Sequence, residues 1–212
     1  MLRMITVHHL ENSRSQRVLW LLEELGLPYE IKHYTRDLET NLAPPELKAV
    51  HPLGKSPVIT DGERVVTESG AITDYIIRRH GGGRLAPAPG SDAHETYLEW
   101  LHFAEGSAMT PFLLALYTAR LGDAAAPLQP RIQEQIGSHV AYFSAQLGEN
   151  DWLVGNTLSG ADIMMSFIAE IASAQGLGAH FPNLLAYARR LQARPAWQAA
   201  MAKTEPYNFL IK

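Results

Sequence analysis

Residues 51–69 read HPLGKSPVITDGERVVTES, and this stretch predicts the core of a small ligand site. A Ser-Pro step at residues 56–57 precedes a short apolar strand. A prolyl peptide bond can be cis, which would turn neighbouring backbone N–H and C=O groups outward toward a ligand. Asp61-Gly62 then gives a strong two-residue turn signal, so we expect a hairpin between residues 57–60 and 63–67.

The end of the same stretch predicts a helix start that can hold an anion. Glu68 and Ser69 follow the second strand and open a helical pattern over residues 69–80. The first N–H groups of a helix have no intrahelical partner and lie at the positive end of its dipole, which suits a carboxylate. Together with the backbone groups at the Ser-Pro step, this arrangement would suit a small acidic peptide.

The segments before this stretch complete an α/β unit of roughly 80 residues, in the order β-α-β-α-β-β-α. Val18, Leu19, Leu22 and Leu25 recur at helical spacing, and Gly26 predicts the end of that helix. The expected elements before the hairpin are a strand over 4–10, a helix over 15–25, a strand over 29–34 and a short helix over 44–50.

The character of the chain changes after residues 81–92, GGGRLAPAPGSD, whose Gly and Pro content predicts a linker. The residues beyond it show helical patterns and no convincing strand, which predicts an all-helical bundle. We expect an N-terminal domain over 1–81, a linker over 82–92 and a helical domain over 93–212. Helices are expected over 93–120, 128–148 and 159–175 and after Pro182 and Pro195.

Composition narrows the class of protein. The 212 residues are 46% hydrophobic and 19% charged, with a net charge of −4 and no basic stripe of the kind that binds nucleic acid. No apolar run approaches the ~18 residues of a membrane span. A single basic residue, Arg3, precedes a short strand-like segment rather than a signal sequence, so we expect a cytoplasmic protein.

The chain contains no cysteine. Disulfides, thiolate metal ligands and a cysteine nucleophile are therefore excluded, and any thiol chemistry must use a thiol of the substrate. The nine histidines show no metal-ligand spacing, so we expect no metal. His8 and His9 alternate along a strand, and we interpret them as structural or surface residues.

Four patches of the sequence, spread over both expected domains, resemble the soluble glutathione S-transferase family. They are SRSQRVLWLLEELGLPYE at 13–30, PPELKAVHPLGKSPV at 44–58, ESGAITDYI at 68–76 and LVGNTLSGADIMMSF at 153–167. The WLLEEL and HPLGKSP details are most similar to a bacterial and fungal branch of that family. The resemblance implies a thioredoxin-like N-terminal domain and a homodimer.

The resemblance also implies an activity. Glutathione would be the co-substrate, and its thiolate would attack a hydrophobic electrophile or reduce a peroxide. The alternative is a non-catalytic glutathione sensor or carrier on the same fold, since fold does not fix function.

The resemblance implies a hydroxyl or thiol donor just after the first strand that stabilises the glutathione thiolate. A free thiol has a pKa of about 8.5, so little of it is ionised at neutral pH. The family uses Tyr, Ser or Cys here, but the chain lacks Cys and its first tyrosine, Tyr29, follows the first helix. Ser13 occupies the corresponding serine position, with Asn12 and Ser15 as alternatives. Ser13-x-x-Gln16 also fits a capping box, so Ser13 could serve only as a helix cap.

The same resemblance implies contacts for each part of glutathione. Lys55 would bind the glycyl carboxylate, although a solvated loop lysine is the simpler interpretation. Ser56 would present its backbone to the cysteinyl unit, with Pro57 in cis. Glu68 would accept from the γ-glutamyl ammonium and Ser69 would donate to its carboxylate, unless Ser69 is only an ordinary helix N-cap.

Further expectations concern the helical domain. Glu105 would reach the γ-glutamyl end across a dimer interface, or else be simply a polar interface or solvent residue. Asp162 would bond back to Ser159 in a capping box. A hydrophobic stripe would line the electrophile pocket or belong to the core; its residues are Met109, Phe112, Leu116 and Tyr117.

Overall fold

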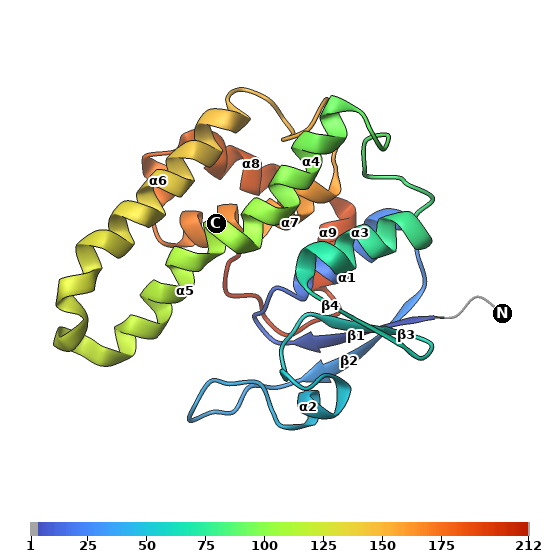
Figure 1. Ribbon diagram of the computed structural model, residues 1–212, viewed down its shortest axis with the longest axis horizontal. Helices are drawn as coiled ribbons and strands as arrows, with labels where there is room; N and C mark the ends of the chain where they lie inside the picture. The colour runs from blue at the N-terminus through green and yellow to red at the C-terminus, as the bar shows by residue number, and fades with distance from the viewer. Residues whose placement is uncertain (1–3, 212) are drawn as a thin grey trace.

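The N-terminal part of the chain folds into the α/β unit that the sequence predicts (Figure 1). The computed structural model describes residues 4–211, so Arg3 and the outermost ends of the two expected domains lie outside the described residues. The βαβαββα order is confirmed, with elements β1 (Ile5–Leu10), α1 (Gln16–Leu25), β2 (Tyr29–Tyr34), α2 (Glu46–Val50), β3 (Val58–Asp61), β4 (Arg64–Thr67) and α3 (Ser69–Arg79).

The four strands form one sheet in the order β2-β1-β3-β4. β1 runs parallel to β2 and antiparallel to β3, and β3 runs antiparallel to β4. In the register, Val58 lies opposite both His8 of β1 and Thr67 of β4. The chain therefore leaves β1, enters β3 and leaves β4 at the same end of the sheet.

The hairpin turn differs by one residue from the prediction. Asp61 pairs with Arg64 across the two strands, so the two-residue loop begins at Gly62 and Asp61 stays in β3. Gly62 has a φ of 61°, which suits glycine at the first loop position of a tight hairpin. One Asp61 oxygen accepts from the Tyr75 hydroxyl at 2.7 Å and lies 2.8 Å from His80 Nε2, and these contacts with α3 hold Asp61 at the strand end.

α1 is buried on more than the one face that its pattern predicts. Val18, Leu19, Leu22 and Leu25 are buried as expected, but so are residues 20 and 21. The reason is that α1 lies between the sheet and the helices α7 and α9, which cover its outer side (Figure 1). Gly26 ends the helix with a φ of 62°, as predicted.

The rest of the described chain is helical, and no residue between 92 and 211 lies in a strand. The helices expected over 128–148 and 159–175 are confirmed to within one residue at each end. The elements are α4 (Asp92–Phe103), η1 (Ala104–Ala108), α5 (Met109–Thr118), η2 (Ala119–Leu128), α6 (Gln129–Leu147), α7 (Gly160–Ala174), η3 (Leu177–Ala179), α8 (Pro182–Gln192) and α9 (Pro195–Met201). The exact division into 1–81, 82–92 and 93–212 stays a prediction.

The long helix expected over 93–120 is interrupted. Residues 104–108 form one wide π turn between α4 and α5, and the α-helix ends at Thr118. Pro111 has no N–H to donate to the preceding turn and its ring crowds the carbonyl four residues back. A single π turn is a common way to absorb such a misfit within a helix.

Two features of the helical part contact the N-terminal α/β unit. α7 is buried along residues 160–172 and forms the centre of the core. After α9 the chain returns toward the loop that follows β1 (Figure 1), where the Asn208 N–H donates to Asn12 Oδ1 at 2.8 Å. Tyr207, one residue earlier, is buried. The C-terminal segment, residues 202–211, therefore packs against the beginning of the chain.

Candidate active site

The candidate site begins in the loop between β1 and α1. Asn12 has a φ of 45°, and this turn carries Ser13 to the end of β1. Ser13 is 7% exposed, whereas Ser15 is fully buried. Asn12 Oδ1 already accepts the Asn208 N–H, so part of its amide is committed to the C-terminal segment.

The predicted Ser13–Gln16 capping box does not form. The N-cap of α1 is Ser15, two residues later than expected. Ser13 Oγ accepts from the Ser15 N–H at 3.2 Å and lies 2.8 Å from Ser15 Oγ. The Gln16 amide turns away and donates to Glu170 Oε2 at 3.1 Å, because a buried carboxylate requires hydrogen-bond donors.

Residues from the other strand ends lie close to this loop in the sheet. The Ser56–Pro57 peptide bond is cis, as predicted, and Ser56 Oγ donates to the His8 carbonyl at 3.0 Å. Lys55 is exposed just before it. Since His8 and Val58 are direct neighbours in the register, residues 55–57 lie beside the end of β1.

The start of α3 lies at the same sheet end. Ser69 is the first helical residue and is 5% exposed, while Glu68 is the N-cap, so the interpretation of Ser69 as N-cap is wrong by one position. Glu68 is exposed and has a φ of 67°, a backbone conformation uncommon for a non-glycine residue. Glu68 and Ser69 follow Thr67, the residue opposite Val58 in the hairpin.

Glu105 lies in the π turn and faces two arginines of its own chain. Its two oxygens accept from Arg14 and Arg17 respectively. Burial alone would raise the pKa of Glu105, but the charges of Arg17 and Arg14 outweigh it and hold that pKa below its usual value. The interpretation of Glu105 as a solvent residue is therefore wrong, and its contact with a partner subunit stays a prediction.

The four residues proposed for the electrophile pocket do not share one environment. Met109 and Phe112 are 5% and 4% exposed and belong to the hydrophobic core. Leu116 and Tyr117 are 56% and 57% exposed on the last turn of α5. Sequence spacing identified one helix stripe, but α5 crosses from the core to the surface along its length.

Sequence reasoning missed a second group beside Ser13. His9 is 2% exposed and its Nδ1 lies 2.9 Å from Ser15 Oγ, while His8 Nδ1 lies 2.9 Å from the Tyr34 hydroxyl. The surface interpretation of both histidines is therefore wrong. The available signal was that β1 is an inner strand of the sheet, where both faces are covered and a histidine needs polar partners.

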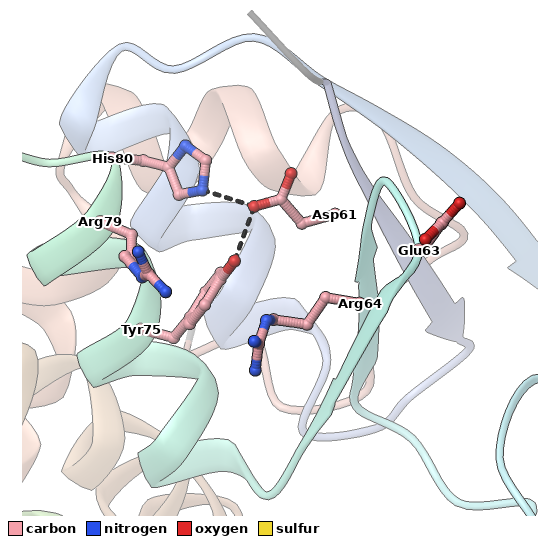
Figure 2. Close-up of a pocket in the computed structure, with 6 residues that line it drawn as sticks. All are labelled: Asp61, Glu63, Arg64, Tyr75, Arg79 and His80. Carbon is pink, nitrogen blue, oxygen red and sulfur yellow. Dashed lines mark hydrogen bonds and ion pairs between the residues drawn. The ribbon is translucent and has the colours of Figure 1, made fainter.

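One open hollow of the structure lies elsewhere. A pocket of about 650 Å³ opens between the β3–β4 hairpin and α3 (Figure 2), and the hydrogen bonds of Asp61 cross it. It is lined by Asp61, Glu63, Arg64, Tyr75, Arg79 and His80. It contains none of the residues expected to bind glutathione, so pocket volume does not identify the candidate site.

Residues 4–211 contain no group of three or more His, Cys, Asp or Glu side chains arranged to hold a metal ion. Along that same range, no helix combines the length and the apolar character needed to cross a membrane.

Comparisons with known proteins identify the family. Residues 2–78 match the model of the glutathione S-transferase N-terminal domain, and residues 106–195 match that of the C-terminal domain. Glutathione S-transferase 3 of Schizosaccharomyces pombe is 32% identical over 95% of this chain and 88% of that protein. The chain therefore belongs to the glutathione S-transferase family, whose members are enzymes that use glutathione as co-substrate.

Solved structures agree with this assignment. A crystal structure of a glutathione S-transferase from Actinobacillus pleuropneumoniae is 37% identical, with a TM-score of 0.88 over 97% of this chain and 94% of that one. A sphingomonad glutathione S-transferase complexed with glutathione is 27% identical, with a TM-score of 0.77 over 93% and 97% of the two chains. The thioredoxin-like N-terminal domain and the helical C-terminal domain are thereby confirmed.

Proposed function

We propose that this transferase conjugates glutathione to hydrophobic electrophiles at the sheet end where β1, β3 and β4 meet, with Ser13 as the donor to the thiolate. One observation carries the proposal. The register aligns His8, Val58 and Thr67 on neighbouring strands, so the loop after β1, the segment before β3 and the start of α3 leave the sheet together. Segments distant in sequence thus converge on one site.

The chemistry of these segments matches the three parts of glutathione. Lys55 is exposed and can attract the glycyl carboxylate. The backbone at Ser56 and Pro57 can pair with the cysteinyl unit as an added strand does at a sheet edge. The N-terminus of α3 at Ser69 offers N–H groups to the γ-glutamyl carboxylate, and Glu68 can accept from its ammonium. The sphingomonad relative, whose structure contains glutathione, supports the choice of ligand.

Hydrogen-bond capacity favours Ser13 over its two neighbours as the donor. Ser15 is fully buried and its hydroxyl is surrounded by protein partners, whereas Ser13 retains some exposure. Ser13 Oγ uses one lone pair to accept the Ser15 N–H, and a hydroxyl can still donate its proton elsewhere. The amide of Asn12 is directed to the C-terminal segment through its oxygen.

The exposed apolar residues support a hydrophobic co-substrate. Leu116 and Tyr117 at the end of α5 are exposed, and so is Leu42 in the loop after β2, which is 55% exposed. Arg120 Nη2 donates to the Thr40 carbonyl at 2.8 Å and holds these two regions together. Met109 and Phe112 are buried, so they can influence a bound electrophile only indirectly, through the packing that positions α5. Peroxide reduction would use the same thiolate.

A homodimer and a cytoplasmic location are part of the same proposal, taken from the family resemblance. Within one chain the Glu105 carboxylate is engaged by Arg14 and Arg17, which leaves it less able to attract the ammonium of a partner's glutathione. Sedimentation at micromolar concentration tests the dimer, and a species of one chain's mass alone would contradict it.

The test of Ser13 is the ultraviolet thiolate absorbance of bound glutathione, titrated from about pH 5 to 9, which brackets the free thiol pKa of about 8.5. For the wild type we expect a thiol pKa below the free value. Ser13→Ala should raise it by about 1–2 pKa units, because a hydrogen bond to a charged group contributes about 1.5–3 kcal/mol. Ser138→Ala, an exposed serine on α6, is the matched control.

The same titration separates the alternatives. Binding with an unshifted thiol pKa in the wild type would favour the non-catalytic carrier. An unchanged pKa and unchanged turnover of an aryl halide in Ser13→Ala would exclude Ser13 as the donor.

A further inference from the structure

A chain of four polar side chains runs from Ser13 through the interior to the C-terminal segment. Ser13 Oγ lies 2.8 Å from Ser15 Oγ, and Ser15 Oγ lies 2.9 Å from His9 Nδ1. His9 Nε2 lies 3.5 Å from Glu205 Oε2. Ser15 and His9 are 0% and 2% exposed, so the middle of this chain is sealed from solvent.

The hydrogen-bond capacity of these groups sets the direction of donation. An ionised carboxylate only accepts, so Glu205 favours a proton on His9 Nε2 and leaves Nδ1 as an acceptor. Ser15 has two acceptors within reach, His9 Nδ1 at 2.9 Å and the Leu10 carbonyl at 3.3 Å, and its single hydroxyl proton goes to the nearer one, Nδ1. The two lone pairs of Ser15 Oγ accept from the Leu10 N–H, at 3.3 Å, and from the Ser13 hydroxyl. Every proton in the chain therefore points inward, from Ser13 toward His9.

In this arrangement Ser13 offers the site a lone pair rather than a proton. One lone pair of its oxygen accepts the Ser15 N–H and the other remains available. That is the correct polarity to accept a hydrogen bond from a thiol S–H. It is the wrong polarity to stabilise a thiolate, which needs a donor. Ionisation of the thiol must therefore be accompanied by reversal of the chain.

We propose that Ser13, Ser15 and His9 form a proton relay that removes the thiol proton of bound glutathione and deposits it on His9 beside Glu205. The S–H bond breaks and its electron pair stays on sulfur. Ser13 Oγ and Ser15 Oγ each gain one proton and pass one on, and His9 Nδ1 gains the last to give an imidazolium. Nothing is oxidised or reduced. After the transfer both hydroxyls point outward, and Ser13 donates to the thiolate.

The charged surroundings of His9 fit this role. Burial is the largest influence and lowers the pKa of His9 to about 4, so the ring is neutral in the free protein at pH 7 and holds a proton less readily than an ordinary histidine. Glu205 and Glu11 act to raise that pKa, and His33 on β2 acts to lower it. A proton on His9 is therefore favourable only when an anion forms together with it, and a thiolate at the other end of the relay is such an anion.

The relay rests on the proposed function, but it makes a separate prediction about protons. If the thiol ionised directly to solvent, each thiolate would release one proton to the buffer. If His9 retains the proton, thiolate forms at pH 7 with almost no release. The experiment mixes the full-length protein with glutathione in weak buffer and records thiolate absorbance and a pH indicator in the same sample.

Variants at the inner end of the relay, His9 and its neighbour Glu205, locate the proton. His9→Gln removes the acceptor, so we expect the thiolate fraction at pH 7 to fall about tenfold, equivalent to about one pKa unit, and the remaining thiolate to release a full proton. His180→Gln, an exposed histidine after η3, is the matched control and should behave as the wild type.

Glu205→Gln protects the test against a misfolded His9 variant, because the Glu205 side chain is 36% exposed and lies outside the regular helices. It keeps the size of the side chain and removes the charge beside the imidazolium. We expect it to raise the pH at which bound thiolate forms. The conservative Glu205→Asp keeps the negative charge, so we expect the pH at which bound thiolate forms to return part of the way to the wild-type value. A contact with only a structural role predicts no such recovery.

The outcomes separate the two proposals. Wild-type protein that does not bind glutathione would overturn the proposed function together with the relay. Thiolate that appears with one proton released, in wild type and His9→Gln alike, would overturn the relay and leave Ser13 conjugation standing. If Glu205→Gln forms bound thiolate with the same pH dependence as the wild type, Glu205 and the C-terminal segment take no part in the mechanism.

Discussion

The fully buried carboxyl group of Glu170 leads to a prediction about stability and pH. It lies in the middle of α7 and accepts from Gln16 Nε2 at 3.1 Å, Gln192 Nε2 at 3.0 Å and the Tyr207 hydroxyl at 2.6 Å. Burial raises the pKa of Glu170 from 4.5 to about 7, because the hydrogen bonds and the nearby Arg17 only partly offset the loss of water.

The sign and size of the effect follow from proton linkage. Between pH 4.5 and about 7 the folded protein keeps a proton on Glu170 that the unfolded chain has lost. The free energy of unfolding therefore decreases as pH rises through this window and does not recover above it. At about 1.4 kcal/mol per pKa unit, the loss attributable to Glu170 is about 3 kcal/mol.

The assay is urea unfolding of wild type and Glu170→Gln from about pH 4.5 to 8, which spans the linkage window of a carboxyl group shifted in this way. The amide cannot ionise, so the difference in unfolding free energy between the two proteins should shift by about 3 kcal/mol in favour of the variant across the window. Because the two proteins share all other titrating groups, the contributions of those groups to the unfolding free energy cancel in this difference. Glu149→Gln, an exposed residue after α6, should give parallel curves. Parallel curves for Glu170→Gln as well would refute the reasoning.

Three further predictions concern stability. Glu105→Gln should cost about 3–5 kcal/mol in urea unfolding, because it leaves the 1% exposed Arg17 without its charge partner; a cost below 1 kcal/mol would contradict this. Asp162→Ala should lower the unfolding free energy by about 2–4 kcal/mol, since the carboxylate accepts from the Ser159 N–H and hydroxyl and two further donors; the melting temperature in calorimetry reports the loss. Gly160→Ala should cost about 1–3 kcal/mol because its Cβ would lie 2.9 Å from both Ile77 Cδ1 and Thr73 Cγ2 of α3, across the contact between the two domains; an unchanged urea midpoint would show that α3 and α7 can move apart there without cost.

Local signals predicted those elements whose partners lie nearby in the chain. Gly26 ends α1 in the left-handed conformation, and Ser159 caps α7 with Asp162 as the sequence pattern indicates. The Ser56–Pro57 bond is cis as the family resemblance implied, whereas the local pattern alone showed only that a prolyl step there can be cis. At Gly26 and Ser159 the deciding interaction spans only a few residues, which is the range over which a sequence pattern carries information.

The predictions that failed concern residues whose deciding partners lie far away in the sequence. Gln16 satisfied the local capping pattern but donates instead to Glu170, a residue from another domain, because an unsatisfied carboxylate in the core costs more than a missing cap. The hairpin turn moved by one residue since Asp61 is held by α3. His9 was interpreted as a structural or surface residue with no link to Ser13, yet only Ser15 lies between the two side chains. The sequence could not show this, because its partner Glu205 comes from the far end of the fold.

That distance along the chain has a consequence for biosynthesis. His9 and Glu205 are separated by 196 positions of the 212-residue chain. At about 5–20 residues per second, a ribosome needs roughly 10–40 s to make the second after the first. The thioredoxin-like domain can therefore begin to fold while its histidine still lacks the carboxylate, and a nascent chain can assemble the proposed glutathione site in outline well before it gains the carboxylate at the end of the proposed relay.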